Sequence, residues 1–388
     1  MSFGKMPMAN GFLKKKNFKK EFFYKLEVGF CKKNYLFQVN DYPKPPKIFN
    51  NDYPFFTGKS LYMTKHFKEY FNWMFTKKYI KKNSKCIEIG SNDGTMLVNF
   101  KKSGIDCTGF EPSRNVANFS KKIKLKVINK FFSYKEVSKF KNMKSKINLI
   151  CAANVICHIP DLNDLIKSID YTLSADGVFI FEEPYLGSMF KKISYDQIYD
   201  AHIYMFSIHS VKNIFKSKGF DLIDAIPQKT HGGSMRYVIA RSGSKKIEPQ
   251  IKKLIMREKK QNLHSIKSCI KFKKKCIKSK NDFINKILNF KKKGLKICGY
   301  AASAKSTTVF NFCKLNHNHI DYIADSTKEK IGKFSPGAHI PVVSIEHFRK
   351  NYRDVAILCA WNHKKEILNK EKLFVKKGGK WISHIGKF

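Results

Sequence analysis

Apolar runs of strand length alternate with helix-like segments between residues 85 and 241. The runs lie at residues 85–90, 105–111, 125–129, 147–153, 177–183, 220–226 and 235–241. This alternation predicts a doubly wound α/β sheet whose strands are mainly parallel. The last two runs stand close together, which predicts an antiparallel hairpin at the edge of that sheet. We therefore expect one sheet with a strand for each of these runs.

Apolar spacing also divides the rest of the chain. Residues 1–75 are mostly irregular, apart from a strand pair around residues 22–39 and a helix at residues 62–77 that should pack against the sheet. Residues 244–292 are rich in lysine and keep helical spacing, which predicts one or two long amphipathic helices. Strands from Leu295 and at residues 320–324, 355–360 and 380–384 predict a second, smaller Rossmann-like sheet. The predicted parts are a lid (1–75), a ligand-binding domain (76–243), a helical connector (244–292) and a C-terminal domain (293–388).

The segment Glu88-Ile-Gly-Ser-Asn-Asp-Gly94 turns from the first strand into a helix. It has neither the GxGxxG nor the GK[ST] pattern of pyrophosphate sites. Asp93 suits a ligand with a ribose and a cationic tail, and Glu111, at the tip of the second strand, suits ribose hydroxyls. S-adenosylmethionine fits that description, and the strand order matches the class I methyltransferase variant of the doubly wound fold. A purely structural turn is the alternative.

Further polar residues stand at later strand ends, where such sheets bind ligands. Asn154 follows the fourth strand and is placed to hold the methionine end of the cofactor. His158 is either a ligand contact or a buried imidazole. The predicted cofactor contacts are Glu88, Gly90, Asn92, Asp93, Gly94, Glu111, Asn154 and His158.

The segment 195–202 holds two tyrosines, two aspartates and one histidine, a density that predicts a catalytic loop. Glycines at residues 232–233 allow close approach of a ligand, although a plain hairpin turn explains them nearly as well. In the smaller sheet, Gly299 and the helix start near Ser303 are suited to an anion, with Lys305 as the countercharge. A purely structural Rossmann copy is the alternative for that part.

The net charge of +46 and the pI near 9.9 raise nucleic acid as a partner. Lysines are spread over nearly every surface-like segment, so charge alone does not establish that role, and we expect no nucleic-acid partner. The ten cysteines form no CxxC pair, and Cys31-Lys-Lys-Asn34 is only half of a zinc knuckle, so we predict no bound metal. No apolar stretch approaches the length of a membrane span. We expect a cytoplasmic monomer or homodimer.

Several segments, taken together and in order, resemble the three-part sugar C-methyltransferases of deoxysugar biosynthesis. The matching segments are residues 4–10, 88–95, 110–113, 154–160, 195–207, 231–236, 299–305, 333–341 and 361–362. The resemblance implies an N-terminal zinc-type module, an S-adenosylmethionine domain and a C-terminal Rossmann-like domain. It further implies a nucleotide-linked 4-keto-6-deoxy sugar as substrate, whose C3 proton is removed so that the enolate takes the methyl group.

The catalytic loop of that family reads Tyr-His-Glu-His, and the aligned residues are Tyr199, Asp200, Ala201 and His202. The resemblance implies His202 as the base, with Tyr199 and Asp200 in the catalytic set. The family's glutamate would orient the imidazole, and alanine cannot. Asp200 or Asp196 could substitute from a neighbouring position.

C3-methylation of a nucleotide-linked sugar is therefore the first hypothesis. Methyl transfer to oxygen or nitrogen is one alternative, and a non-catalytic, basic nucleic-acid-binding or scaffold protein with a retained methyltransferase core is another. The predicted substrate contacts are Tyr185, Tyr195, His231, Gly232, Lys305, Trp361 and Asn362.

Overall fold

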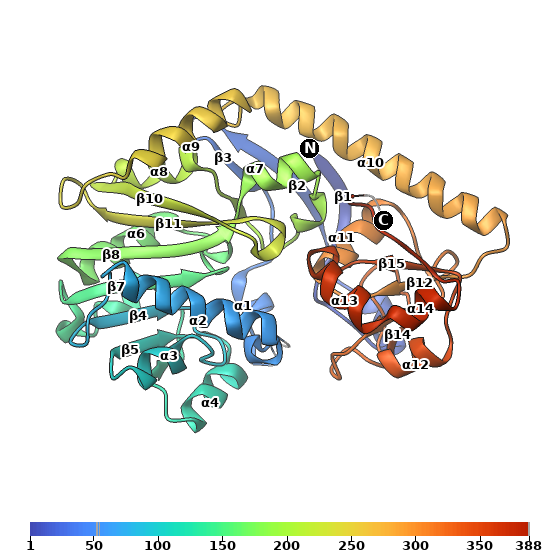
Figure 1. The fold of residues 1–388 in the computed structure, drawn as a ribbon, viewed down its shortest axis with the longest axis horizontal. Coiled ribbons are helices and arrows are strands. Elements are labelled where there is room, and N and C mark those ends of the chain that lie inside the picture. Colours follow the sequence, from blue (N-terminus) through green and yellow to red (C-terminus); the bar gives the residue numbers. More distant parts are fainter. Residues whose placement is uncertain (52, 54, 387–388) are drawn as a thin grey trace.

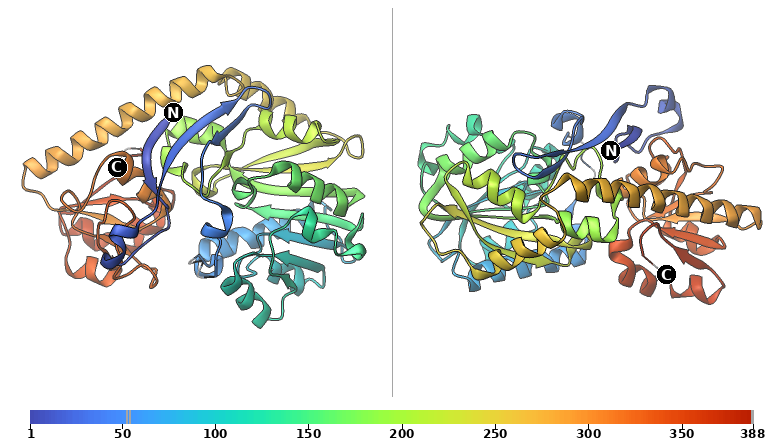
Figure 2. Two further views of the ribbon diagram at one scale, coloured as in Figure 1. Left: turned by 180° about the vertical axis from the view of Figure 1, so that it is seen from behind. Right: turned by 90° about the horizontal axis from the view of Figure 1, so that it is seen from above.

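The computed structural model describes residues 1–51, 53 and 55–386. Two α/β parts stand side by side, and the long helix α10 (Ile266–Lys292) runs along the outside of both (Figure 1). A small N-terminal sheet lies at the junction of the two parts (Figure 2). The molecule is thus one assembly of three sheets.

The central sheet has seven strands in the order β10-β11-β8-β7-β4-β5-β6. All neighbours are parallel except β11, which is antiparallel to both β8 and β10. The predicted seven-stranded sheet with a hairpin at its edge is confirmed. The strands are β4 (Lys85–Ile89), β5 (Asp106–Phe110), β6 (Val127–Ile128), β7 (Ile147–Ala153), β8 (Leu173–Pro184), β10 (Phe220–Gln228) and β11 (Ser234–Arg241).

Helices cover both faces of this sheet because successive strand residues point to opposite sides. Cys86, Leu149 and Val178 belong to one buried cluster with α2, whereas their neighbours Ile150 and Phe179 belong to the other with α6 and α8. The predicted lead-in helix α2 therefore packs against the sheet as expected. The helices are α2 (Leu61–Thr76), α3 (Leu97–Lys102), α4 (Arg114–Lys122), α5 (Tyr134–Val137), α6 (Leu162–Thr172), α7 (Leu186–Lys192) and α8 (Ile208–Lys216).

The N-terminal sheet is antiparallel and has the order β1-β2-β3-β9. Its strands are β1 (Ser2–Pro7), β2 (Phe23–Cys31), β3 (Leu36–Val39) and β9 (Tyr204–Met205), and a short helix α1 (Pro45–Ile48) follows. The predicted strand pair is confirmed, whereas β1 was not predicted. Since β9 directly follows the segment 195–202, the sheet is built partly from the chain beside the predicted catalytic loop.

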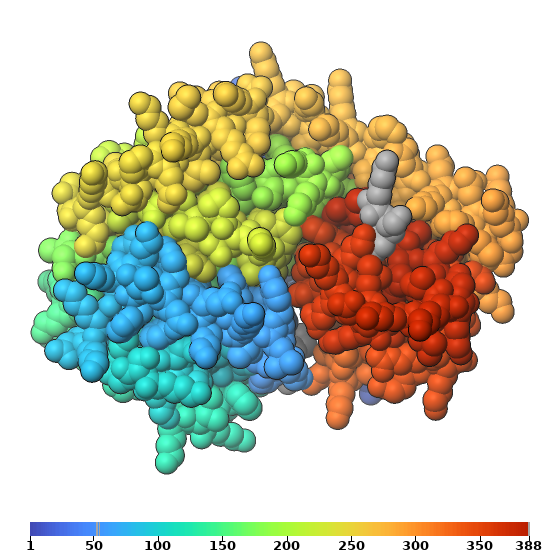
Figure 3. Space-filling model, viewed as in Figure 1, coloured from blue at the N-terminus to red at the C-terminus, as the bar shows by residue number. Residues whose placement is uncertain are grey.

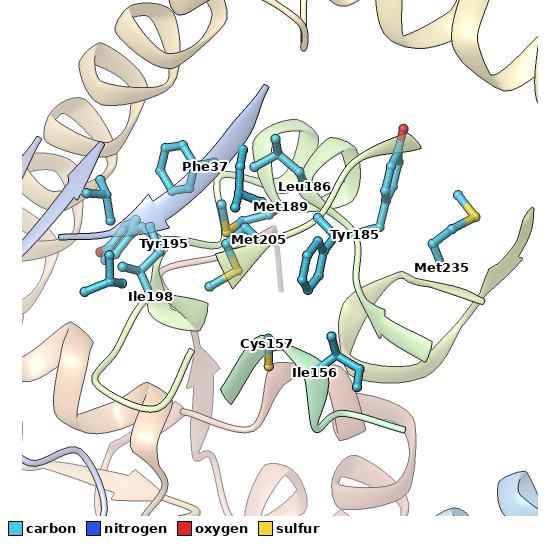
Figure 4. Packing of buried hydrophobic residues seen from close by; sticks show 14 of the residues in the cluster. Phe37, Ile156, Cys157, Tyr185, Leu186, Met189, Tyr195, Ile198, Met205 and Met235 are labelled. Carbon is cyan, nitrogen blue, oxygen red and sulfur yellow. The ribbon is translucent and has the colours of Figure 1, made fainter. Parts of the chain in front are cut away.

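Apolar side chains from several segments join this sheet to the central part. Phe37 of β3 packs near Leu186 and Met189 of α7, with Met205 of β9 and Ile198 beside them (Figure 4). The small N-terminal sheet has little core of its own, so its stability depends on this shared cluster.

The C-terminal sheet has five parallel strands in the order β14-β13-β12-β15-β16. The strands are β12 (Ile297–Tyr300), β13 (Ile323–Asp325), β14 (Val342–Ser344), β15 (Val355–Leu358) and β16 (Lys380–Ile382). The helices are α11 (Ala304–Phe312), α12 (Ile345–Lys350), α13 (Lys364–Lys370) and α14 (Lys372–Lys376). Strand β14 was not predicted, and the other four were.

Two helices connect the larger parts, α9 (Pro249–Lys260) and α10, as the apolar spacing predicts. Phe272 of α10 stacks on Phe190 with ring centres 4.2 Å apart. The ring centre of Phe283, also on α10, lies 6.1 Å from that of His384. One rigid helix therefore touches both parts. Across the described residues, no helix combines the length and the apolar character needed to cross a membrane.

Candidate active site

The carboxyl ends of strands from the central sheet and from the C-terminal sheet face one cavity of about 640 Å³. The central sheet reverses its strand order between β4 and β7, and Gly90 and Asn154, which follow those strands, line the cavity. The C-terminal sheet reverses its order between β12 and β15, and the loops after those strands contribute Ser303 and Ala360. Open α/β sheets bind ligands at such reversal points. Two binding crevices thus open into one cavity, at the seam visible between the two parts (Figure 3).

The crevice of the central sheet fits S-adenosylmethionine. Gly90 has φ +66°, and a Cβ there would lie 2.4 Å from Val155, so only glycine lets the turn pass this close. Three buried polar atoms at this crevice have no hydrogen-bond partner among the described residues: Glu88 Oε2, Ser91 Oγ and Asn154 Oδ1. Unpaired buried polar atoms are costly unless a ligand satisfies them. These groups are suited to the ammonium and hydroxyl groups of the cofactor.

Glu111 is held ready for a ribose at the tip of β5. Its Oε1 accepts the N–H of Ser113 at 2.7 Å, and its Oε2 accepts the N–H of Asn92 at 2.9 Å. Burial raises the pKa of Glu111, and the two N–H groups oppose that shift. Each carboxylate oxygen keeps a second lone pair for a ribose hydroxyl.

Asn92 and Asp93 bind a protein segment in this structure. Asn92 Oδ1 accepts the N–H of Thr57 at 3.0 Å, and Asp93 Oδ2 accepts the N–H of Gly58 at 2.7 Å. Asn92 lines the cavity, whereas Asp93 and Gly94 lie outside the wall that the described residues form. Asn92 and Asp93 thus fasten the segment around Thr57 beside the crevice, and the predicted cofactor contacts at Asp93 and Gly94 do not reach the cavity that the described residues form.

His202 is oriented by a main-chain carbonyl. Its Nδ1 donates to the carbonyl of Gln197 at 2.8 Å, and because a carbonyl only accepts, Nδ1 must carry the proton. Nε2 is then an acceptor, and it takes the hydroxyl proton of Tyr199 in a 2.6 Å hydrogen bond. Burial and the neighbouring His158 lower the pKa of His202 well below its ordinary value. The pair is therefore a neutral base with a phenol on its lone pair.

His158 lies between this pair and the cofactor crevice. Its Nδ1 donates to the carbonyl of Ala201, its ring centre is 5.2 Å from that of His202, and burial lowers its pKa. Cys157 completes a cluster of metal-ligand type, but its sulfur is 3.6 and 3.8 Å from the two nitrogens of His158. In this structure Nδ1 of His158 and both ring nitrogens of His202 are already engaged in hydrogen bonds within the protein.

Neither neighbouring aspartate contacts His202. Asp200 accepts the N–H groups of Ala9 at 3.0 Å and Ala201 at 2.8 Å, and burial raises its pKa to about 6. Asp196 accepts the indole N–H of Trp361 at 2.6 Å. Neither carboxylate therefore takes the orienting role that the sequence analysis allowed for Asp200 or Asp196, and the group bonded to His202 Nδ1 is the Gln197 carbonyl.

Two further carboxylates lie on β8, the neighbour of β7 in the sheet. Glu182 is fully buried, and burial raises its pKa while His66, Arg236 and Thr230 lower it to about 2. Glu183 Oε1 accepts three N–H groups, from residues 155–157, and burial nevertheless raises its pKa to about 7. Both acids hold the scaffold behind the cavity, and Glu183 fixes the turn that carries His158.

The crevice of the C-terminal sheet is cationic. Lys305 donates to Asn362 Oδ1 at 3.2 Å, Lys330 donates to the carbonyl of Ala302 at 2.7 Å, and burial lowers the pKa of each ammonium. All three side chains line the cavity, as does His231, whose Nε2 has no partner among the described residues. This end of the cavity suits an anionic group.

Four predicted substrate contacts lie behind the wall that the described residues form. Tyr185 donates to Glu258 at 2.8 Å, and Tyr195 is fully buried with its hydroxyl 3.8 Å from Cys313. Gly232 and Trp361 pack against each other. Other wall residues were not among the predicted contacts, and they include Asn10, Phe49, Tyr53, Phe55, Gln197 and Lys330. Asn10 and Gln197 lie in the segments 4–10 and 195–207 that match the family, and those matches were the signals available for them.

The N-terminal part does not fit a structural zinc ion. Residues 1–49 contain one cysteine, Cys31, and no histidine. A structural zinc site needs four such ligands. Residues 1–49 therefore cannot complete a structural zinc site by themselves.

Three protein domain families match the chain in succession. Their descriptions are "Putative zinc binding domain" over residues 1–49, "Methyltransferase domain" over residues 62–225 and "C-methyltransferase C-terminal domain" over residues 229–386. The C-methyltransferase NovU of Streptomyces niveus is 25% identical over 387 residues, which cover 99% of this chain and 92% of NovU.

Solved structures align with about half of the chain at low scores. A magnesium protoporphyrin IX methyltransferase from Synechocystis PCC 6803 with bound S-adenosylmethionine gives a TM-score of 0.36 at 11% identity, covering 51% of this chain and 89% of that one. A methyltransferase from Archaeoglobus fulgidus gives 0.36 at 17% identity, covering 42% and 72%. The domain matches and NovU carry the assignment. They identify the chain as an S-adenosylmethionine-dependent methyltransferase whose sequence matches, in succession, a putative zinc binding domain, a methyltransferase domain and a C-methyltransferase C-terminal domain.

Proposed function

We propose that the protein methylates C3 of a nucleotide-linked 4-keto-6-deoxy sugar. The observation that carries this proposal is the order of groups along one cavity. Acceptors for a ribose and an ammonium lie in the first crevice, the neutral pair of Tyr199 and His202 lies between, and Lys305 and Lys330 lie in the second crevice. A nucleotide-linked sugar matches this order, because its reacting carbon belongs to an uncharged sugar ring and a diphosphate is attached to that ring.

The bound cofactor supplies a methyl group on a positively charged sulfur. The ketone at C4 acidifies the C3 proton, and His202 Nε2 accepts that proton. The electron pair of the C–H bond forms the enolate, and Tyr199 turns its hydroxyl from Nε2 to donate to the enolate oxygen. The same electron pair would then form the bond from C3 to the methyl group, which the cofactor would supply while the carbon–sulfur electron pair stays on its sulfur.

The Gln197 carbonyl supports this role in place of the glutamate. When Nε2 takes the proton, the imidazolium still donates through Nδ1 to that carbonyl. The hydrogen bond to this carbonyl raises the pKa of His202, but burial and the neighbouring His158 outweigh it and lower the pKa well below its ordinary value. His202 therefore stays neutral through the physiological pH range, ready to accept a proton.

The cationic crevice supports an anionic substrate. The ammonium groups of Lys305 and Lys330 come from different segments of the C-terminal part, and both reach the cavity. Each has a protein acceptor, yet an ammonium has three donors, so two remain on each for phosphate oxygens. A diphosphate held here would place its sugar toward Tyr199 and His202.

The test uses two separate readouts on dTDP- and GDP-linked 4-keto-6-deoxy sugars. The first is transfer of a labelled methyl group from S-adenosylmethionine, with the product carbon identified by NMR. The second is exchange of the C3 proton with deuterium oxide in the absence of the cofactor, which reports enolate formation alone. We expect both with the native protein and neither with His202→Ala. Transfer to oxygen or nitrogen without C3 exchange would refute the enolate mechanism and support the other acceptors.

A further inference from the structure

Trp361 lies behind the cavity wall, where residues of four other segments surround it. Its Nε1 donates to Asp196 Oδ2 at 2.6 Å. A Cβ on Gly232 would lie 2.1 Å from the ring, so the indole fills the space that glycine leaves. The ammonium groups of Lys305 and Lys192 lie 5.0 and 5.6 Å from the ring centre. The indole is thus held by Asp196 at its N–H, and Gly232 and the two ammonium groups lie around its rings.

Asp196 is a fully buried carboxylate whose partners come from the C-terminal part. Besides Trp361, its Oδ1 lies 3.5 Å from His384 Nε2. Burial raises the pKa of Asp196, but His384, Lys305 and Trp361 together lower it below its ordinary value. A buried charge depends strongly on the groups that compensate it. The position of Asp196 therefore depends on residues 293–388.

The next residue along the chain is the one that orients the base. Asp196 and Gln197 belong to the same short 3-10 turn, η5 (Tyr195–Gln197). The carbonyl of Gln197 accepts the Nδ1 proton of His202. A continuous path therefore runs from the indole N–H through the Asp196 carboxylate and the Gln197 peptide to the imidazole. A second link is parallel to it, because Thr308 of α11 donates to the carbonyl of Ile198 at 3.0 Å.

The other side of the indole belongs to the cationic crevice. Asn362 follows Trp361 in the chain and accepts from Lys305, whose ammonium also lies over the ring. A phosphate that binds Lys305 therefore acts on the same side chain that holds Asp196. The two contacts join the crevice of the C-terminal sheet to the orientation of the base.

We propose that Trp361 is a positioning residue for His202, through Asp196 and the Gln197 carbonyl. By this path the C-terminal part acts on the reaction as well as on substrate binding. The inference rests on the proposed function in one respect, the role of His202 as the base. The position of His202 itself is a separate observable, and the experiment below measures it directly.

The variant Trp361→Phe removes the indole N–H and keeps an aromatic ring against Gly232. Trp381→Phe is the matched control, because Trp381 is another tryptophan of the C-terminal part, is buried, and has no hydrogen-bond partner for its Nε1 among the described residues. Misplacement of a catalytic group by a fraction of an ångström to 1 Å costs about 10- to 100-fold in rate. We expect that loss in kcat for Trp361→Phe, with the KM for S-adenosylmethionine unchanged, and a kcat near that of the native protein for Trp381→Phe.

A spectroscopic readout separates positioning from catalysis. In protein labelled with 15N-histidine, the Nδ1–H signal of His202 is identified by its absence in His202→Gln. We expect Trp361→Phe to shift or broaden that signal and Trp381→Phe to leave it unchanged. An unchanged signal in Trp361→Phe overturns the proposal, whatever the rate. A changed signal in a protein whose methyl transfer survives His202→Gln leaves the positioning role standing and removes His202 as the base.

Asp196→Ala breaks the same hydrogen bond from its other end, so it serves if Trp361→Phe does not fold. If both single variants fold, a double-mutant cycle tests whether Trp361 acts through Asp196. If Trp361 acts through Asp196, the double variant is no slower than the slower single variant. Effects on kcat that multiply would mean that the two residues act independently, and this would overturn the path.

Discussion

The Glu111 carboxylate offers a sharp test of how the cofactor is held, and the variant is Glu111→Gln. Its two oxygens accept backbone N–H groups of Ser113 and Asn92, so both oxygens are fixed in place before the cofactor arrives. A glutamine has one acceptor oxygen and one NH2 group. Whichever way the amide turns, its NH2 group faces one of these two N–H donors and loses that bond.

The magnitude follows from these bonds. The variant loses one bond to a ribose hydroxyl and weakens the bonds that remain, since they no longer involve a charge. Hydrogen bonds to charged groups contribute about 1.5–3 kcal/mol each. We therefore expect S-adenosylmethionine binding to weaken by about 2–4 kcal/mol, which is on the order of 30- to 700-fold in Kd.

Calorimetric titration with S-adenosylmethionine measures this change, and Asp325→Asn is the matched control. Asp325 stands at the tip of β13, the counterpart of β5 in the C-terminal sheet, and accepts the N–H of Thr327 at 2.7 Å. It lies outside the cavity wall that the described residues form. Its substitution should leave the Kd within about threefold of the native value, well inside one factor of ten or 1.4 kcal/mol. A Kd for Glu111→Gln within that same range, in a folded protein, would refute the assignment of Glu111 to the ribose.

Three further predictions concern the rest of the cavity and its scaffold. Tyr199→Phe keeps the ring on His202 but removes the donor to the enolate oxygen, so kcat and C3 exchange should fall about 10²- to 10³-fold with cofactor binding unchanged; equal rates would remove Tyr199 from the reaction. Lys305→Gln should raise the KM for the nucleotide-linked sugar about 10-fold or more and weaken its dependence on salt, whereas Lys292→Gln, at the exposed end of α10, should do neither. Glu183 has a pKa of about 7 when folded, above its unfolded value, so the stability it contributes is fully present below about pH 4.5 and is lost as the pH rises through 7. Between pH 6 and pH 8 the native protein should therefore lose about 1.4 kcal/mol relative to Glu183→Gln, measured as the difference in unfolding free energy; a constant difference would contradict the raised pKa.

The central sheet could be predicted from the sequence because a local pattern of residues marks each of its strands. Each buried strand is a run of apolar residues, and the acids, glycines and amides that follow the runs reach the same edge of the sheet by topology alone. Glu88, Gly90, Glu111 and Asn154 were predicted by that reasoning, and all four line the cavity. By contrast, β14 has three residues and β1 contains Gly4 and ends at Pro7, so neither gave a clear strand pattern.

Residues whose place depends on distant partners were not readable in this way. Lys330 is one of 76 lysine and arginine residues, and it reaches the cavity because the carbonyl of Ala302 holds its ammonium. Trp361 was predicted to touch the substrate because residues 361–362 are one of the segments that match the family. Its indole instead points away from the cavity wall toward Asp196, a partner 165 positions away in the chain. A motif gave the right loop and could not give the direction of the side chain.

The substitution at Ala201 shows how far a motif comparison can mislead about chemistry. Such a comparison looks for a side chain to replace the lost glutamate, and two aspartates stand close by in sequence. The group that His202 Nδ1 contacts is a main-chain carbonyl, which every residue has and which no sequence pattern can single out. The aspartates serve the same end indirectly: Asp200 ties the loop to Ala9, and Asp196 ties it to Trp361. Both bonds fix the loop on which the Gln197 carbonyl lies, so a base can keep its orientation without its carboxylate if the loop around it is held from outside.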